Sequence, residues 1–284
     1  MNDHLFSADL TPSRAADNAG DGELGRPATL DVSIVVPYYN PGARLRTTVE
    51  RTVEVLREAG VTFEIIAVSD GSTDGSQLSL VGLPEEVVRQ VELGRNEGKG
   101  QALQVGLSMG HGRYLGFLDA DGDLSPELLA PFVTLMRLYE PDIILGSKRH
   151  PMSAVSYPPL RRLYSVGYQA LIRVLFRLDV RDTQVGLKLV KREVIASVLP
   201  LLVERRFAFD LELIAVANSL GYDRVFEAPV RIEERFRSTI SLRAVGGMLV
   251  DTLAIFVRLR ILHRYRRGRS PVRGGGPEGR PGPT

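Results

Sequence analysis

The chain has 284 residues, of which 44% are hydrophobic and 25% are charged, as in an ordinary globular protein. This length allows one large domain or two small ones. The absence of cysteine excludes disulfide bonds, thiol nucleophiles and cysteine-based metal centres. No apolar run reaches the roughly 18 residues of a transmembrane helix, so we expect none. Met1–Thr29 lacks the apolar core of a signal peptide, which predicts a cytoplasmic location.

The two ends of the chain differ from its centre in composition. Residues 1–28 mix Ser, Asp, Gly and Pro without periodicity, which predicts a disordered leader. Residues 268–284 are dense in Gly and Pro, which predicts a disordered tail. Between Arg235 and Arg273 there are ten arginines and one acidic residue, Asp251, although the whole chain has a formal net charge of only +2. This basic end favours an anionic partner surface, either lipid headgroups or nucleic acid.

Short apolar runs alternate with amphipathic stretches through the first half of the chain. The strand-like runs are residues 32–36, Phe63–Val68, Val87–Leu93, Tyr114–Leu118 and Asp142–Leu145. Helical spacing is found over Arg44–Ala59, Gly100–Met109 and Pro126–Tyr139. This alternation predicts an α/β fold with a Rossmann-like, mostly parallel sheet and helices on both faces. Ligands of such sheets bind at the carboxyl ends of the strands.

The segments that follow the first three predicted strands are rich in polar residues and glycine. Residues 37–41 contain no Gly-x-Gly-x-x-Gly motif, which argues against a dinucleotide oxidoreductase. Residues 69–75, Ser-Asp-Gly-Ser-Thr-Asp-Gly, form either a capped turn or a ligand contact. Residues 94–100 lack the spacing of a P-loop, but a glycine-rich turn that carries Lys99 into a helix can still hold a phosphate.

Three carboxylates at alternate positions, Asp119, Asp121 and Asp123, follow the fourth predicted strand. Residues two apart on an extended chain point the same way, so bare carboxylates here would repel one another. A hard divalent cation would neutralise them, and Mg²⁺ or Mn²⁺ usually completes its coordination with substrate phosphates. The alternative is an exposed acidic turn. An EF-hand is excluded because Leu124 and Ala130 occupy positions that need Gly and Glu.

Together, the motifs at the predicted strand ends resemble family 2 glycosyltransferases, which bind a nucleotide sugar in a GT-A fold. The matching segments of the first half are residues 36–40, 69–75, 95–100 and 119–121. In the second half, residues 181–188 and 204–213 resemble the dolichyl- and polyprenyl-phosphate hexose synthases, the glucosyl branch more closely than the mannosyl one. The resemblance covers about residues 31–265.

The resemblance implies a site for the sugar donor. The donor nucleotide would be bound by Pro37, Tyr39, Asn40, Asp70, Lys99, Asp119 and Ala120. Asp121 would hold Mg²⁺ or Mn²⁺ against the pyrophosphate, with Asp119 and Asp123 as further metal ligands. We therefore expect a UDP-hexose as the donor, with GDP-mannose as the alternative.

The resemblance also implies an acceptor site and a reaction. The acceptor phosphate would be bound by Lys148, Arg149, Arg161, Ser165 and Gln184. The catalytic residues would be Asp121, Asp182 and Lys188. Of these three, Lys188 would also help to hold the acceptor. The expected enzyme is a metal-dependent, inverting hexosyltransferase that moves glucose, or mannose as the alternative, to polyprenyl or dolichyl phosphate. A phosphate monoester is already largely deprotonated at neutral pH, so this transfer needs no strong general base.

Several alternatives are left open. A family 2 transferase that acts on a sugar hydroxyl would need a carboxylate base, for which Asp210 is the candidate. A non-catalytic nucleotide-binding protein is disfavoured, because it would have no reason to keep three mutually repelling acids. Asp182 and Gln184 either orient the acceptor or brace their loop. Asp210 and Glu212 either act on the substrate or pair with Arg205 or its neighbour Arg206.

Two segments predict how the protein meets a lipid. Pro159–Leu178 has an apolar stripe and a basic face, typical of a membrane-interface helix or of a surface helix packed on the core. Ala244–Val257 is largely apolar and is followed by arginines. We expect a catalytic domain over residues 29–239 and an amphipathic membrane-interface region over residues 240–267, bound peripherally to the cytoplasmic face of a membrane. Nucleic acid is disfavoured because no RNA-binding aromatic motif accompanies the arginines, and a homo-oligomer is left open.

Overall fold

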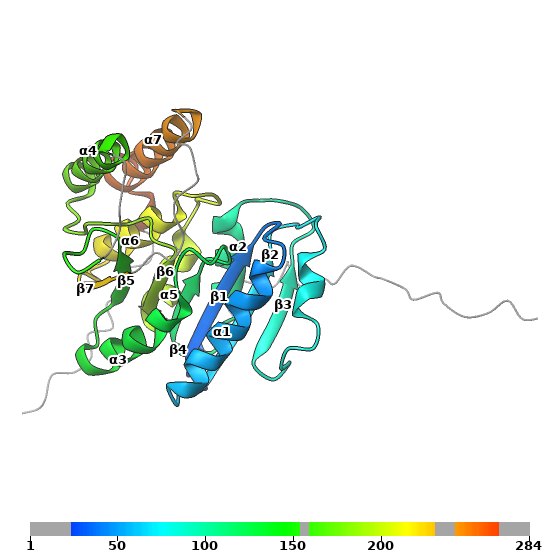
Figure 1. The fold of residues 1–284 in the computed structure, drawn as a ribbon. Helices are drawn as coiled ribbons and strands as arrows, with labels where there is room; N and C mark the ends of the chain where they lie inside the picture. Colours follow the sequence, from blue (N-terminus) through cyan, green and yellow to red (C-terminus); the bar gives the residue numbers. More distant parts are fainter. Residues whose placement is uncertain (1–23, 154–158, 231–241, 267–284) are drawn as a thin grey trace, which may run out of the picture.

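The computed structural model describes residues 24–153, 159–230 and 242–266. Its centre is a seven-stranded sheet in the order β3-β2-β1-β4-β6-β5-β7 (Figure 1). The strands are β1 (Leu30–Tyr38), β2 (Phe63–Ser69), β3 (Val88–Glu92), β4 (Gly112–Leu118), β5 (Ile143–Ser147), β6 (Leu187–Lys191) and β7 (Val225–Pro229). Strand β6 runs antiparallel to both of its neighbours, β4 and β5, whereas the other pairs are parallel. The prediction of a mostly parallel α/β sheet is therefore confirmed.

Helices cover both faces of this sheet. They are α1 (Arg44–Glu58), α2 (Lys99–Ser108), α3 (Leu129–Tyr139), α4 (Pro159–Phe176), α5 (Arg192–Val198), α6 (Phe209–Ser219) and α7 (Leu242–Phe256), with the short helical turns η1 (Ser76–Leu80), η2 (Pro126–Leu128), η3 (Leu199–Leu201), η4 (Val257–Ile261) and η5 (Arg264–Arg266). Helices α1 and α3 share one apolar core with the sheet. Helices α2, α5 and α6 share the other core with the opposite face.

The helix α1 illustrates how the sequence pattern becomes a buried face. Leu45, Val49, Val53 and Leu56 are three or four residues apart, so they lie on one side of the helix and are all buried. The chain leaves the helix at Gly60, whose φ of 63° lies in the left-handed region that glycine adopts without strain. The helix predicted over residues 44–59 is therefore present, ending at Glu58.

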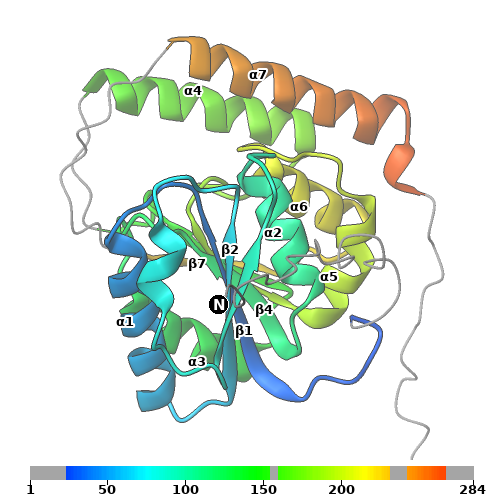
Figure 2. The same cartoon turned by 90° about the vertical axis from the view of Figure 1, so that its right-hand side faces the viewer.

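Helices α4 and α7 lie side by side beyond α2 and α6, at one end of the molecule (Figures 1 and 2). The hydroxyl groups of Tyr168 on α4 and Thr252 on α7 are 2.9 Å apart, and the rings of Phe176 and Phe256 meet edge to face. The buried side chains of Ile172 and Ile255 join the core that α6 shares with the sheet. Among the described residues, no helix has both the length and the apolar character needed to cross a bilayer.

The predicted leader and tail fall mostly outside the described residues, as does the segment 231–241. The described chain begins at Leu24, which packs against the core, and Arg192 donates a hydrogen bond to the carbonyl of Arg26. The domain boundaries at residues 28 and 239 remain predictions.

Candidate active site

A pocket of about 780 Å³ lies beyond the carboxyl ends of β1, β2 and β4. These strands are parallel, so the loops that follow them meet at one edge of the sheet. All seven residues that the sequence assigned to the donor nucleotide line this pocket, namely Pro37, Tyr39, Asn40, Asp70, Lys99, Asp119 and Ala120. Asp121 and Gln184 line it as well.

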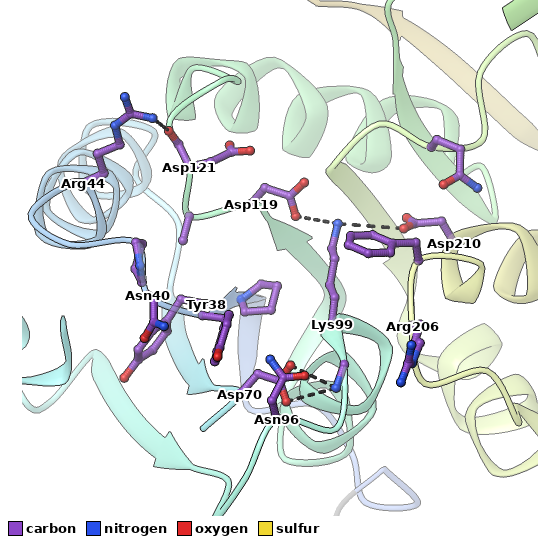
Figure 3. A pocket seen from close by; sticks show the side chains of 17 residues that line it. Tyr38, Asn40, Arg44, Asp70, Asn96, Lys99, Asp119, Asp121, Arg206 and Asp210 are labelled. Carbon is purple, nitrogen blue, oxygen red and sulfur yellow. Dashed lines mark hydrogen bonds and ion pairs between the residues drawn. The ribbon is translucent and has the colours of Figure 1, made fainter. Parts of the chain in front are cut away.

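The ammonium group of Lys99 stands between two carboxylates in this pocket (Figure 3). Its Nζ lies 2.6 Å from Oδ1 of Asp119 and 3.9 Å from Oδ2 of Asp210. Burial alone would lower the pKa of Lys99, but the two carboxylates outweigh it and hold the pKa above its usual value. Burial raises the pKa of Asp119, and the Lys99 ammonium opposes that rise. Lys99 is therefore a permanently charged group that fixes two acids.

A second ammonium group, from Lys188, contacts Asp210 behind the pocket, so positive and negative groups alternate from Asp119 through Lys99 and Asp210 to Lys188. Lys188 has no exposed surface, and its Nζ donates to the carbonyl of Val185 and to the carboxylate of Asp210. Both ammonium groups also approach the ring of Phe117, whose centroid lies 5.7 Å from Nζ of Lys99 and 5.1 Å from Nζ of Lys188. Lys188 therefore fixes Asp210 and does not line the pocket, and its predicted roles in catalysis and in holding the acceptor stay predictions.

The antiparallel strand β6 leaves room for Asp119 only because residue 186 is glycine. The amide of Asp119 donates to the carbonyl of Gly186 at 3.0 Å. A Cβ atom at position 186 would lie 1.9 Å from Oδ2 of Asp119, far inside contact distance. The glycine of the motif at residues 181–188 therefore has a steric role in placing the Asp119 carboxylate.

The carboxylate of Asp70 binds the glycine-rich turn before α2. It accepts hydrogen bonds from the amides of Glu97, at 2.7 Å, and Gly98, at 3.0 and 3.1 Å. These amides are the ones that a phosphate at the start of α2 would need. The Asp70 carboxylate thus occupies the position in this turn where the sequence predicts that an anion could bind. It also holds the backbone of the two residues that directly precede Lys99.

A loop from the second half of the chain forms the far side of the pocket. Arg206 and Phe207, which precede α6, line it, and the side chain of Phe207 is 72% exposed. Within the described ranges, no carboxylate forms an ion pair with Arg206. Neither residue is among the site residues predicted from the sequence. The family resemblance includes Glu204–Leu213, so the sequence did mark this segment. Only the tertiary structure shows that it lies next to the loops that follow β1, β2 and β4.

The pocket contains more acidic than basic side chains. Asp70, Asp119, Asp121 and Asp210 face the three basic residues Arg44, Lys99 and Arg206. Among the described residues, no group of three or more acids or histidines is arranged around a common point. Asp123 does not line the pocket, and its amide donates to the carboxylate of Asp121 at 3.1 Å. One or two carboxylates that share a cation with phosphates form a donor set that suits Mg²⁺. Asp121 and Asp119 line the pocket and fit such a set, whereas the metal-ligand role of Asp123 stays a prediction.

The sequence matches the family described as "Glycosyl transferase family 2" over residues 33–199. It is 30% identical to dolichyl-phosphate beta-glucosyltransferase ALG5C of Trichomonas vaginalis, over 82% of this chain and 73% of that one. It is 32% identical to the human dolichyl-phosphate beta-glucosyltransferase, over 67% of this chain and 64% of that one. The chain belongs to glycosyl transferase family 2.

Solved structures agree with this assignment at the level of the fold. Glucosyl-3-phosphoglycerate synthase of Mycobacterium tuberculosis, crystallised with Mn²⁺ and UDP, superimposes with a TM-score of 0.61. The match covers 81% of this glycosyltransferase and 79% of that protein, at 19% sequence identity. The GT-A-type sheet expected from the resemblance is therefore confirmed.

The residues predicted to bind the acceptor phosphate are only partly brought together. Gln184 lines the pocket, and its amide nitrogen is buried with no hydrogen-bond partner in the described parts of this glycosyltransferase. Lys148 and Arg149 follow β5 and do not line the pocket. Arg161 and Ser165 fall in the first turns of α4, where the side chains lie outside the described structure. Among the members of this group whose side chains are described, Gln184 is the one that lines the pocket.

One predicted acidic residue, Asp182, holds two backbone amides. The carboxylate of Asp182, which is buried, accepts from the amides of Lys148 and Gln184, both at 3.2 Å. Burial raises the pKa of Asp182, and these hydrogen bonds oppose the rise. Of the two roles left open for Asp182, the geometry supports bracing the loop that carries Gln184.

Of the alternatives left open for Asp210 and Glu212, pairing with Arg205 or Arg206 is not found among the described residues. Asp210 pairs with the two lysines described above, and Glu212 accepts from the amides of Val203 and Glu204. Arg205 instead lies 3.1 Å from Glu97. The reason is that Asp210 and Glu212 begin helix α6 and point into the core, whereas the arginines lie on the exposed loop before it.

Proposed function

We propose that this glycosyltransferase moves a hexose, with glucose favoured, from a nucleoside-diphosphate sugar to dolichyl or polyprenyl phosphate. The observation that carries the proposal is the meeting of the seven donor residues with Gln184 in one pocket. The relatives named dolichyl-phosphate beta-glucosyltransferase support the sugar and the lipid acceptor. The mycobacterial synthase, which was crystallised with UDP-glucose, supports a UDP-hexose as donor.

In this proposal, the pocket binds the donor by its nucleotide end. Tyr39 and Asn40 follow β1 and lie beside the Asp70 turn, because the amide of Thr73 donates to Asn40 at 2.8 Å. These residues would hold the nucleoside. The diphosphate would then lie toward Arg206, whose guanidinium suits phosphate oxygens.

The excess of acidic over basic side chains in the pocket supports the proposal that a divalent cation binds there. A nucleoside diphosphate brings further negative charge to a site that already has four carboxylates and three basic residues. Asp121, with Asp119 beside it, would hold Mg²⁺ or Mn²⁺. The bound cation would neutralise the departing diphosphate.

The acceptor is proposed to be a phosphate because the carboxylate that would serve as the base for a sugar hydroxyl is already engaged. Asp210, the candidate base for a sugar hydroxyl, is buried and tied to two ammonium groups, Lys99 and Lys188. A phosphate monoester needs no such base, since it is already an anion at neutral pH. Its oxygen would form a bond to the anomeric carbon while the bond from that carbon to the diphosphate breaks, which inverts the configuration. Gln184 would direct its free amide nitrogen toward the incoming sugar or phosphate.

The helices α4 and α7 are proposed as the surface that meets the membrane at its cytoplasmic face. Exposed apolar side chains are found along these helices and in the turn η4 that follows α7, at Val166, Val174, Leu249, Val250, Leu253 and Val257. Exposed arginines lie next to them, at positions 173, 177 and 260. Apolar side chains beside arginines are typical of a surface that lies in the interface of an anionic bilayer.

The proposal is tested by a transfer assay with purified protein, Mg²⁺ or Mn²⁺, and radiolabelled polyprenyl phosphate. UDP-glucose, UDP-galactose and GDP-mannose are compared as donors, and products are separated before and after mild acid. We expect an acid-labile glucosyl lipid with UDP-glucose and far less product with the other two donors. Transfer only to a saccharide hydroxyl, or no transfer from any donor, would overturn the proposal.

A further inference from the structure

The loop that carries Arg206 and Phe207 into the pocket is held by a buried carboxylate. Oε2 of Glu212 accepts hydrogen bonds from the amides of Val203 and Glu204, both at 2.8 Å. Glu212 has no exposed surface. A buried carboxylate that accepts two backbone amides fixes the chain at that point, because losing it would leave both amides unsatisfied.

The C-terminal segment supplies the other contacts of this carboxylate. The hydroxyl of Tyr265 donates to Oε1 of Glu212, and the Tyr265 side chain is buried. The guanidinium of Arg258 pairs with Glu204 and lies 3.9 Å from Glu212. Burial and the hydrogen bond to Glu212 raise the pKa of Tyr265, which keeps its hydroxyl protonated as a donor.

The opposite side of the same loop rests on the start of α2, the helix that begins with Lys99. The amide of Gln101 donates to the carbonyl of Arg205 at 3.0 Å, and the side chain of Gln104 donates to the carbonyl of Glu204. A Cβ atom on Gly98 would lie 2.4 Å from the carbonyl oxygen of Arg205. The loop is therefore held between the donor-binding turn and the C-terminal segment 257–266.

We propose that Glu212, Arg258 and Tyr265 are positioning residues, which hold loop 203–207 so that Arg206 and Phe207 face the sugar donor. This inference extends the proposed function, because it assigns residues after α7 to the donor site. The segment 257–266 directly follows a helix with an exposed apolar face, so the same contacts join that face to the pocket. None of the three side chains lines the pocket itself.

The effect expected on donor binding depends on the fraction of molecules in which loop 203–207 is correctly placed. If losing one contact leaves the loop in place for about a tenth of the time, the apparent affinity for the donor falls roughly tenfold. Bound donor selects the same loop position, so the rate at saturation changes little. A change in KM at nearly constant kcat therefore distinguishes positioning from general damage.

The position of the loop can be measured without any transfer reaction. The chain contains no tryptophan, so Phe207→Trp introduces a single fluorescent reporter on the loop. In this background, Tyr265→Phe removes only the hydroxyl that donates to Glu212. We expect lower anisotropy and stronger acrylamide quenching of the reporter, both partly reversed by UDP with Mn²⁺.

The matched control is Tyr168→Phe, which removes a hydroxyl hydrogen bond between α4 and α7 but touches nothing in the loop. It should leave the fluorescence of the reporter unchanged. Equal anisotropy and quenching in the Tyr265→Phe and Tyr168→Phe proteins would overturn the inference. Because this readout needs no product, it stands apart from a failure of the proposed transfer reaction.

Kinetics in the otherwise unaltered protein give the second measurement. Tyr265→Phe and Arg258→Met should raise KM for the nucleotide sugar roughly tenfold, with kcat within about twofold. Arg258→Lys keeps a cation beside Glu204 and should recover part of the loss. Thermal unfolding verifies that each variant is folded at the assay temperature. A proportional loss of kcat with unchanged KM in all three variants contradicts a positioning role.

Discussion

Lys99 and Asp119 form a 2.6 Å ion pair that joins the helix after β3 to the loop after β4. The pair lies within the pocket at the carboxyl ends of the parallel strands, and Asp210 approaches the same ammonium group from α6. One lysine thus sets the position of acids from two distant parts of the chain.

Replacing Lys99 with methionine should abolish most activity. The Asp119 and Asp210 carboxylates would then repel each other without a shared cation, and truncating one partner of a buried charge pair costs about 2–5 kcal/mol. We expect kcat/KM to fall at least roughly a hundredfold. Lys191→Met is the control, because Lys191 pairs with Asp142 and Glu193 at the other end of β6. Activity of the Lys99→Met protein close to that of the control would contradict the assigned role.

Gly186→Ala should displace Asp119 by steric overlap. The new methyl group would meet the Asp119 carboxylate well inside contact distance, so the acid must move away from Lys99. We expect a stability loss of about 1–3 kcal/mol, measured by urea unfolding, and a larger proportional loss of activity. Gly25→Ala is the control because no atom lies within 4 Å of the added methyl group. Equal activity of the two variants would show that Asp119 need not stay in place.

Asp121→Asn should abolish turnover even at saturating Mn²⁺. The substitution removes the charge that we assign to holding the cation but keeps the size of the side chain. Asp123→Asn should retain most activity, since Asp123 does not line the pocket. Chelation with EDTA should stop the wild-type reaction, and added Mg²⁺ or Mn²⁺ should restore it. The assignment fails if Asp121→Asn keeps near-full rate.

Arg258→Met should destabilise the protein in a pH-dependent way. Burial raises the pKa of Glu204, and the neighbouring Arg258 opposes that rise. Without Arg258 the pKa should rise further, and an acid with a raised pKa favours the folded state only while it is protonated. That contribution is present below the unfolded-state pKa of about 4.3 and is lost as the pH rises through the folded-state value.

The loss in the free energy of unfolding of the Arg258→Met protein, relative to the wild type, should therefore be largest at neutral pH. We expect it to be roughly 3 kcal/mol there. It should shrink as the pH falls toward about 5. Urea unfolding of the variant and the wild type across this range measures the difference. A deficit that stays constant, or that grows on acidification, would show that Glu204 does not determine it.

Charged substitutions on α7 should weaken binding to anionic vesicles. Val250→Glu and Leu253→Glu place carboxylates on side chains that are 66% and 50% exposed, so folding should be little affected. We expect less protein to pellet with phosphatidylserine vesicles. Leu138→Glu, at an exposed site on α3, is the control. Point substitutions are preferable to deleting the C-terminal segment, because the deletion would also remove Arg258 and Tyr265 from the donor-site loop.

Much of the first half of this protein was determined by local sequence. Apolar runs form β1, β2, β4 and β5 because strands covered on both faces must be apolar throughout. The polar segments after the strands meet in one pocket because parallel strands end at the same edge of a sheet. The seven residues that the family resemblance assigned to the donor all line this pocket, and their donor-binding roles stay predictions.

The tertiary structure alone decided which charges pair. Lys188, Asp210, Lys99 and Asp119 come from four elements, and their alternation depends on β6 lying antiparallel beside β4. Sequence spacing cannot predict such a contact, because an ion pair between elements depends on how those elements pack. The same holds for Tyr265 and Glu212, which lie 53 residues apart in the sequence and meet only through the packing of the C-terminal segment against the start of α6.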